Sequence, residues 1–210
     1  MDDREFDKAL IAAAFQLAAE KGWRRVSVAT AARAAGLPLD RARERFPGRC
    51  TILLRFGRLA DQSALAETPT QGPARDRLFD LLMRRIDALQ AHRAGLLALL
   101  RALPSEPPTA LLLALATRRS MRWMLEASGI RASGLRGELR ASGLLAVWLW
   151  TVRAWQADES EDLAATMAAL DTALRRAEQA VEWLGWRETR SAPVEPPPED
   201  YAETSDIPPP

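Results

Sequence analysis

Residues 22–50 read GWRRVSVATAARAAGLPLDRARERFPGRC, and this stretch predicts two short helices joined by a tight turn. Ser27 is a favourable N-cap, because its hydroxyl can accept a hydrogen bond from a backbone N–H in the first turn of a helix over 28–34. Gly36-Leu37-Pro38 then interrupts the helical sequence, and a second short helix is expected over 39–45. Two helices joined in this way form a helix-turn-helix.

The same part of the chain is rich in arginine. Nine arginines fall between residues 24 and 58, against two acids, Asp40 and Glu44. The whole chain has a net charge of +1, but residues 188–210 hold six acids and one base, so the preceding residues hold 28 basic and 22 acidic side chains. A basic segment this compact indicates a polyanionic partner, and a solvated helical face is the alternative.

The rest of the chain predicts an all-α protein. Alanine, leucine and arginine dominate, and no β-branched run alternates with period two. Apolar residues between Phe6 and Ala18 recur at three- and four-residue spacing, which predicts a first helix that ends at Lys21-Gly22. Further helices are expected at about 50–66, 74–91, 93–103, 107–128, 134–157 and 160–184, separated by glycine and proline.

Composition also predicts the domain boundaries. The Pro- and Gly-containing segment 68–73 separates a head, residues 1–66, from a larger body, residues 74–187. Residues 188–210 combine prolines with acids and lack the apolar residues that a folded core needs. We expect this last segment to be a disordered tail.

Several functional classes are disfavoured. One cysteine, Cys50, and one histidine, His92, are too few for a disulfide or a typical zinc site, so no metal or cofactor is expected. No nucleophile–base pair or glycine-rich phosphate loop indicates an enzyme. The acidic N-terminus and the absence of a long apolar run predict a cytoplasmic protein that does not insert into membranes.

Residues 22–50 resemble, without a gap, the helix-turn-helix signature of the TetR family of transcriptional regulators. The matching positions are Gly22-Trp23, Ser27, Val28, Ala32, Ala35-Gly36-Leu37 and Phe46-Pro47-Gly48-Arg49. The resemblance implies an all-α fold in which a DNA-binding head is followed by a helical body that binds an effector and dimerises. It implies a homodimer that binds a palindromic double-stranded operator and is released as a repressor by a small apolar effector.

The resemblance also implies the residues that contact DNA. Arg43 replaces a tyrosine that commonly contacts phosphate, and Arg49 stands where the family has a phosphate-binding lysine. Arg41 has the planar fork that suits guanine O6 and N7. Asp40 and Glu44 oppose these contacts, because they repel phosphate. The complete predicted set is Arg41, Arg43, Arg45, Arg49, Ser27 and Leu39.

In the body, the resemblance implies an apolar effector cavity and a dimer interface. The predicted cavity residues are Phe79, Met83, Trp123, Met124 and Trp148, with a filled core as the alternative interpretation. The predicted interface residues are spaced at three and four positions along the last two helices: Leu149, Val152, Trp155, Met167, Leu170, Leu174 and Val181.

A second interpretation comes from a different functional class. The Gly-Leu-Pro turn, the arginine-rich helix and Phe-Pro-Gly also resemble the ubiquinone-biosynthesis accessory proteins, which share the TetR fold, bind isoprenoid lipid and do not bind DNA. Those proteins end in a membrane-seeking amphipathic helix. This chain ends in prolines and acids, which an anionic membrane repels.

Overall fold

The computed structural model describes residues 1–66 and 71–183, and the tail predicted at 188–210 lies outside these residues. The described residues form nine α-helices and two 3₁₀ turns and contain no strand, which confirms the all-α prediction. The helices are α1 (Asp3–Lys21), α2 (Val28–Ala34), α3 (Leu39–Arg45), α4 (Arg49–Leu65), α5 (Ala74–Gln90), α6 (Arg93–Ala102), α7 (Pro107–Ala127), α8 (Gly134–Ala157) and α9 (Ala164–Trp183). The 3₁₀ turns are Trp23–Arg25 and Leu103–Ser105.

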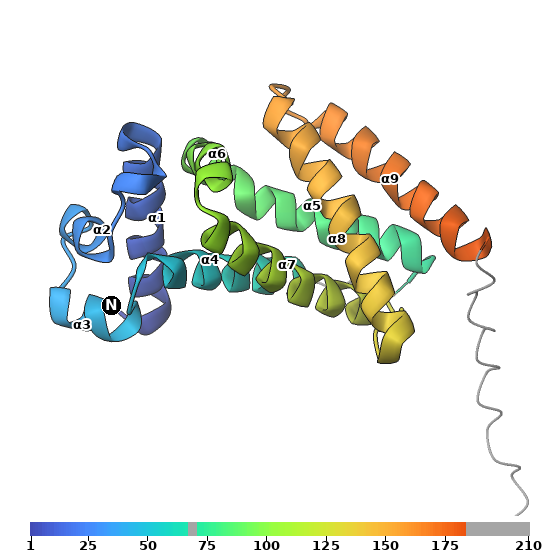
Figure 1. Ribbon diagram of the computed structural model, residues 1–210, viewed down its shortest axis with the longest axis horizontal. Helices are drawn as coiled ribbons and strands as arrows, with labels where there is room; N and C mark the ends of the chain where they lie inside the picture. Colours follow the sequence, from blue (N-terminus) through green and yellow to red (C-terminus); the bar gives the residue numbers. More distant parts are fainter. Residues whose placement is uncertain (67–70, 184–210) are drawn as a thin grey trace, which may run out of the picture.

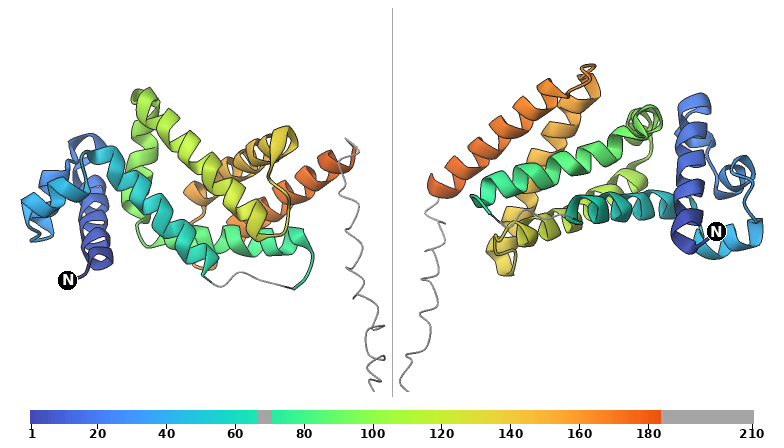
Figure 2. Two further views of the ribbon diagram at one scale, coloured as in Figure 1. Left: turned by 90° about the horizontal axis from the view of Figure 1, so that it is seen from below. Right: turned by 180° about the vertical axis from the view of Figure 1, so that it is seen from behind.

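The helices are arranged as a small head at one end of an elongated body (Figure 1). Helices α1, α2 and α3 form the head, and α4 runs from the head into the body. In the body, α5, α7 and α8 lie close together and α9 packs along α8 (Figure 2). The head is therefore attached to the body through α4 and through the contact of α1 with α6.

A cluster of aromatic rings lies where the head meets the body. Phe15 of α1 packs edge-on against Phe56 of α4, with ring centroids 4.8 Å apart. It also stacks on Trp23, at 6.2 Å, and on His92, at 5.3 Å. Burial lowers the pKa of His92, so this ring is neutral at pH 7 and behaves as part of the apolar contact. The two predicted domains thus share one continuous core.

The backbones of α1 and α6 approach closely at Gly95. A Cβ atom added at this residue would lie 2.2 Å from the carbonyl oxygen of Phe15, which is far inside van der Waals contact. Only glycine permits this distance between the two helices. The close contact fixes the position of the head helix against the first part of the body.

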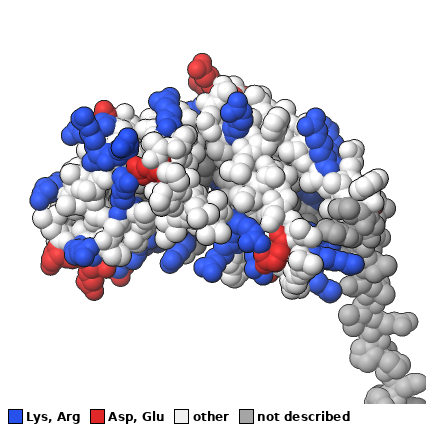
Figure 3. Space-filling model, viewed as in Figure 1, with Lys and Arg blue, Asp and Glu red and all other residues white. Residues whose placement is uncertain are grey.

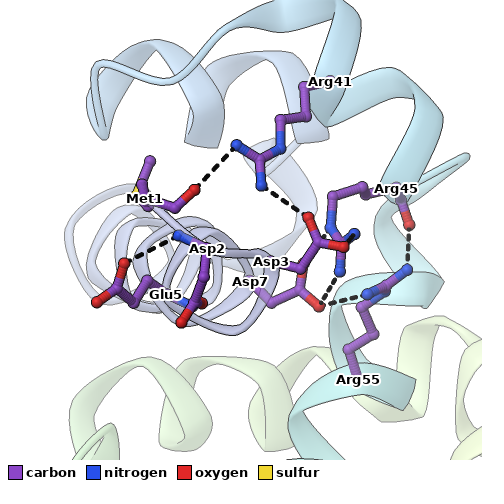
Figure 4. A network of polar contacts seen from close by, with 8 residues as sticks. All are labelled: Met1, Asp2, Asp3, Glu5, Asp7, Arg41, Arg45 and Arg55. Atoms are coloured by element: carbon purple, nitrogen blue, oxygen red, sulfur yellow. Dashed lines mark hydrogen bonds and ion pairs between the residues drawn. The ribbon is translucent and has the colours of Figure 1, made fainter.

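Inside the head, the carboxylate of Asp7 joins α1 to α3 and α4 (Figure 4). Asp7 accepts hydrogen bonds from Nε and Nη2 of Arg45, at 2.7 and 2.9 Å, and from Nη1 of Arg55. Arg55 also donates to the backbone oxygen of Arg45 at 2.9 Å. Burial raises the pKa of Asp7, but the hydrogen bonds from Arg45 and Arg55 outweigh this effect and leave it below its ordinary value.

A second polar network ties four helices of the body together. Arg85 of α5 donates from Nε to Asp61 of α4 at 2.7 Å, and Ser120 of α7 donates to the other oxygen of this carboxylate at 2.5 Å. The guanidinium carbon of Arg85 lies 4.5 Å from the ring centroid of Trp148 on α8, in a cation–π contact. The buried polar groups of this network therefore have partners.

The Asp7 network predicts an acid-sensitive contribution to stability. Replacing Asp7 with Asn removes the carboxylate that Arg55 binds and one of the two that Arg45 binds in a partly buried site, and should lower the free energy of unfolding by about 2 kcal/mol at pH 7. Because the folded-state pKa of Asp7 is lowered, its contribution is complete above its ordinary value, 3.8, and is lost as pH falls through the folded-state pKa. The difference between wild type and D7N should therefore shrink below about pH 4 in urea titrations followed by circular dichroism.

Asp40→Asn is the matched control for Asp7→Asn. Asp40 is exposed on α3 and forms no hydrogen bond or ion pair with the residues that the structure describes. Its replacement should change stability by less than about 0.5 kcal/mol. Equal losses in the two variants would contradict the role given to Asp7.

Candidate nucleic-acid interface

The first helix of the helix-turn-helix begins at the predicted cap. Ser27 accepts a hydrogen bond from the backbone N–H of Thr30 at 3.1 Å, and Thr30 accepts one from the backbone N–H of Ser27 at 2.9 Å. This reciprocal pair forms a capping box at the start of α2. Ser27 is exposed, so its side chain lies at the surface of the head as the sequence predicts.

The turn between α2 and α3 follows from one glycine. Gly36 has a φ of +65°, a conformation that side chains other than glycine rarely adopt. The backbone N–H of Leu37 bonds to the carbonyl of Ala32 at 2.8 Å, and that of Gly36 bonds to the carbonyl of Arg33 at 3.2 Å. These two bonds form a Schellman motif. Leu37 is buried beyond the turn, which anchors the start of α3.

Helix α3 has an inner and an outer face. Ala42 is buried and Arg41 and Arg45 are partly buried, so these residues face the rest of the head. The outer face consists of the exposed residues Leu39, Asp40, Arg43 and Glu44. Two acids and one base on the outer face give it a net charge of −1. The exposed face of the second helix is therefore less basic than the composition of residues 24–58 suggests.

Arg45 lies inside the head instead of at its surface. Its guanidinium binds Asp7 at 2.7 Å and Asp3 at 2.6 Å, and the hydrogen bond to Asp7 is the main cause of its raised pKa. The side chain is 18% exposed. Arg45 holds α3 against α1, so the phosphate contact predicted for it has no support in this arrangement.

Arg41 and Arg43 differ in how accessible their guanidinium groups are to a ligand. Arg41 donates from Nη2 to Asp3 at 2.7 Å and lies 4.6 Å from the ring centroid of Phe6. Its contact with Asp3 is a surface ion pair, because the Asp3 side chain is 67% exposed, and such pairs are weak enough to exchange. Arg43 is exposed and donates to the backbone oxygen of Pro47 at 2.6 Å. Arg43 is the predicted contact residue that lies most clearly on the outer face of α3.

Arg49 connects the head to the body. At the first position of α4, it donates from Nη2 to Glu106 at 2.8 Å. The Glu106 side chain is 11% exposed and also accepts a hydrogen bond from the hydroxyl of Thr109 at 3.1 Å. Glu106 precedes α7, so this ion pair links the predicted phosphate-binding residue directly to a body helix.

Three exposed arginines next to or on α2 were not among the predicted contact residues. Arg24 and Arg25 lie in the 3₁₀ turn before α2, and Arg33 lies in its last turn. All three are exposed, and none forms an ion pair or a side-chain hydrogen bond with another described residue. Figure 3 shows basic side chains spread over the head end of the molecule, with acids along its lower edge. The arginine count indicated such a surface without identifying its members.

The five predicted cavity residues lie in different surroundings. Phe79 lines a groove of about 480 Å³ between α5 and α9, together with Met167. Met124 and Trp148 are buried in the core, and Met83 is partly buried against it. Trp123 is 60% exposed on α7. The burial of Met124 and Trp148 fits the alternative interpretation of a filled core, and Phe79 borders a groove.

Most of the predicted interface residues pack inside the chain. Val152, Trp155, Leu170 and Leu174 are buried, and Trp155 donates from Nε1 to Gln90 at 2.8 Å. Met167 and Val181 are partly buried, and only Leu149, at 56%, is well exposed. The buried positions lie where α8 and α9 pack against each other and against α5, which leaves them no surface for a second chain.

The free apolar surface of α8 is its opposite face. We call this surface the α8 stripe, and it consists of Leu135, Leu139, Ala146, Leu149 and Trp150, all exposed. Leu135, Leu139, Ala146 and Trp150 are spaced by 4, 7 and 4 residues, which places them on one side of a helix. Trp150 was not among the predicted interface residues, although the sequence places it next to Leu149.

The described residues were also compared with the requirements of metal sites and membrane spans. Among them, no group of three His, Cys, Asp or Glu side chains is arranged to hold a metal ion. No helix in the described part of the chain is both long and apolar enough to cross a membrane. Cys50 is partly buried in the first turn of α4.

Comparison with known proteins gives similarity in structure but not in sequence. No protein-family model and no curated protein matches the chain. A TetR transcriptional regulator from Nitrosomonas europaea is similar with a TM-score of 0.67 and 23% identity, over 83% of this chain and 99% of the other. A TetR-family regulator from Streptomyces coelicolor has a TM-score of 0.59 and 23% identity, over 88% and 87% of the two chains.

A putative TetR-family regulator from Rhodococcus sp. is similar to the same extent, with a TM-score of 0.58 and 19% identity over 82% of this chain and 98% of the other. The similarity in each case spans both the head and the body. The chain therefore has the fold of the TetR-family transcriptional regulators.

Proposed function

We propose that this protein is a dimeric, DNA-binding transcriptional regulator that a small effector releases from its operator. The observation that carries the proposal is the helix-turn-helix at the free end of the molecule, whose second helix, α3, exposes Leu39, Asp40, Arg43 and Glu44. A helix exposed in this way can enter a major groove while the preceding helix crosses the backbone. The structural similarity to TetR-family regulators agrees with this function.

The charges on the head suggest how it binds duplex DNA. Arg24, Arg25 and Arg33 are exposed without partners among the described residues, and they are well suited to phosphate contacts. Arg43 adds a positive charge on α3 itself. Asp40 and Glu44 repel phosphate, so their suitable contacts in a groove are base edges, where a carboxylate can accept a hydrogen bond from N4 of cytosine.

Arg49 supplies a connection between DNA binding and the body. Its Nη2 group donates to Glu106, and this carboxylate neutralises part of the arginine's charge and repels a phosphate that approaches the same guanidinium. Any movement of α7 that carries Glu106 away from Arg49 frees this arginine for phosphate. The position of α7 therefore sets the affinity of the head for DNA.

We assign the dimer interface to the α8 stripe. Large apolar side chains gathered on one exposed helix face indicate a surface that another protein covers. A second copy would meet the same stripe across a twofold axis. Two heads held by one such interface can bind the two halves of a palindrome. The groove between α5 and α9 is the candidate effector site. Phe79, Met167 and Ala168 form its apolar wall, and an effector there would also meet the charged lining residues Arg75, Asp76, Asp80 and Asp171.

Replacing Arg43 with Ala should weaken binding to all duplexes. Loss of one phosphate contact should reduce affinity about fivefold and lower the slope of log K against log salt by about one. Arg101→Ala, at an exposed arginine of α6, is the control and should leave both values unchanged. Fluorescence anisotropy with the gene's own upstream duplex measures both quantities. If R43A retains the wild-type salt slope, Arg43 does not contact phosphate.

Replacing Glu106 with Gln should strengthen DNA binding. The amide removes the charge that holds Arg49, and affinity for the same duplex should rise about threefold to tenfold, equivalent to a surface ion pair of about 1 kcal/mol. Arg49→Ala in the E106Q background should abolish the gain, which separates the effect from a general change of net charge. An unchanged affinity in E106Q would remove this link between α7 and the head.

Replacing Leu149 with Glu should dissociate the dimer, because it places a charge inside the apolar contact of the α8 stripe. Size-exclusion chromatography with light scattering should show a change from two chains to one. Leu39→Glu places the same charge at an exposed leucine of the head and should leave the dimer intact. A dimer that persists in L149E places the interface on another face.

A further inference from the structure

A basic groove lies between the head and the body, on the side of α1 that faces α4 and α5. Its volume is about 670 Å³, within the range of small-molecule sites. Helix α1 contributes Arg4 and Lys8, α4 contributes Gln62 and Ser63, and α5 contributes Arg84 and Asp87. In the view from behind in Figure 2, α4 runs from α1 into the body, and α5 lies alongside α4. The groove therefore has walls from both parts of the molecule.

The two cations that α1 contributes to the groove, Arg4 and Lys8, are exposed. Neither forms an ion pair or a side-chain hydrogen bond with another described residue. They are four residues apart on one helix face, where like charges destabilise the helix. An anion between them would remove this repulsion.

Asp3 and Asp7 of α1 do not neutralise these cations, because they turn toward α3 and α4, where Arg41, Arg45 and Arg55 bind them (Figure 4). The carboxylate of Glu5 accepts a hydrogen bond from the backbone N–H of Asp2 at 3.0 Å and forms no ion pair with a described residue. The inner network thus pairs Asp3 and Asp7 on one face of α1 and leaves Arg4 and Lys8 on another.

The remaining polar groups of the groove also suit an anion. Gln62 and Ser63 are exposed, and their side chains form no hydrogen bond with other described residues, so an amide N–H and a hydroxyl are available as donors. Arg84 adds a third positive charge, although it already has an interaction within the chain. Asp87 is the one carboxylate in the lining, which leaves the groove with a net charge of +2.

We propose that this groove binds a small anion that carries phosphate or carboxylate groups, held between Arg4 and Lys8 and bonded by Gln62 and Ser63. Such an anion would touch α1 of the head and α5 of the body at once. It would stabilise the arrangement of head and body to which it binds more tightly. The size of this effect equals the difference between its binding free energies for that arrangement and for the alternative one. An effect of the anion on DNA binding would rest on the proposed regulator function. Binding of the anion itself does not, since it requires no DNA.

Isothermal titration of the full-length protein at low ionic strength tests the site, with pyrophosphate and citrate as separate probes for the phosphate and carboxylate classes. At least one of them should bind saturably, with one site per chain. The double variant Arg4→Gln/Lys8→Gln should weaken that binding about tenfold or more, because it removes two charge-assisted contacts. The probe that binds more tightly identifies the class of anion.

The double variant Arg101→Gln/Arg119→Gln is the matched control. It removes two exposed arginines of the body, so it changes the net charge equally and should alter the affinity less than twofold. Equal weakening in both double variants would show general charge attraction and overturn the site. Absence of saturable binding by both probes would overturn it as well.

A duplex-binding measurement on the same variants separates the site from a DNA contact. If Arg4→Gln/Lys8→Gln weakens duplex binding while probe binding is unchanged, the two cations contact DNA and the proposal is wrong. If the wild-type protein binds a probe but no duplex, the anion site stands and the proposed regulator function fails.

Discussion

The carboxylate of Asp7 holds the head together, and the exposed face of α3 depends on it. A short helix of one and a half to two turns has little stability of its own in water, so α3 must be held by tertiary contacts. Asp7 supplies them by binding Arg45 from α3 and Arg55 from α4 at the same time. Buried Ala42 and Phe46 add the apolar part of the contact. With its inner face fixed in this way, α3 can present only its remaining residues to a ligand.

The same constraint decides which arginines are available to a polyanion. Arg45 and Arg55 serve inside the head, and Arg41 is paired with Asp3 at its edge. Basic charge at the surface comes instead from arginines before α2, at its end and at Arg43. A count of basic residues over a segment thus overstates the charge that a partner meets, because part of that charge is neutralised internally.

The sequence predicts the helices of this fold well, because their limits depend on local signals. Ser27 and Gly36 act on neighbouring residues, and the capping box and the Schellman turn form where the sequence predicts them. The role of Arg45 could not be predicted in this way, since its partner Asp7 lies 38 residues away. Nothing in the pattern of α3 distinguishes an arginine that binds an inner carboxylate from one that faces solvent.

The body shows a second limit of prediction from sequence. Helix α8 is apolar on almost every side around Trp148, Leu149, Trp150 and Trp155, so spacing alone cannot tell the face that packs on α9 from the face that stays exposed. The prediction chose positions at three- and four-residue spacing, and most of them belong to the inner face. A polar side on α8 would have marked the direction of solvent, and α8 has none near its centre.

Two kinds of contact hold the head against the body. The rings of Phe15, Phe56 and His92 form an apolar contact, whose stabilisation is non-directional. The ion pair of Arg49 with Glu106 is directional, and a shift of about an ångström at α7 is enough to break it. The aromatic cluster therefore keeps the head attached to the body, whereas the ion pair depends on the position of α7. A ligand that alters the packing of α7 can change the charge exposed at the start of α4 while the head stays attached to the body.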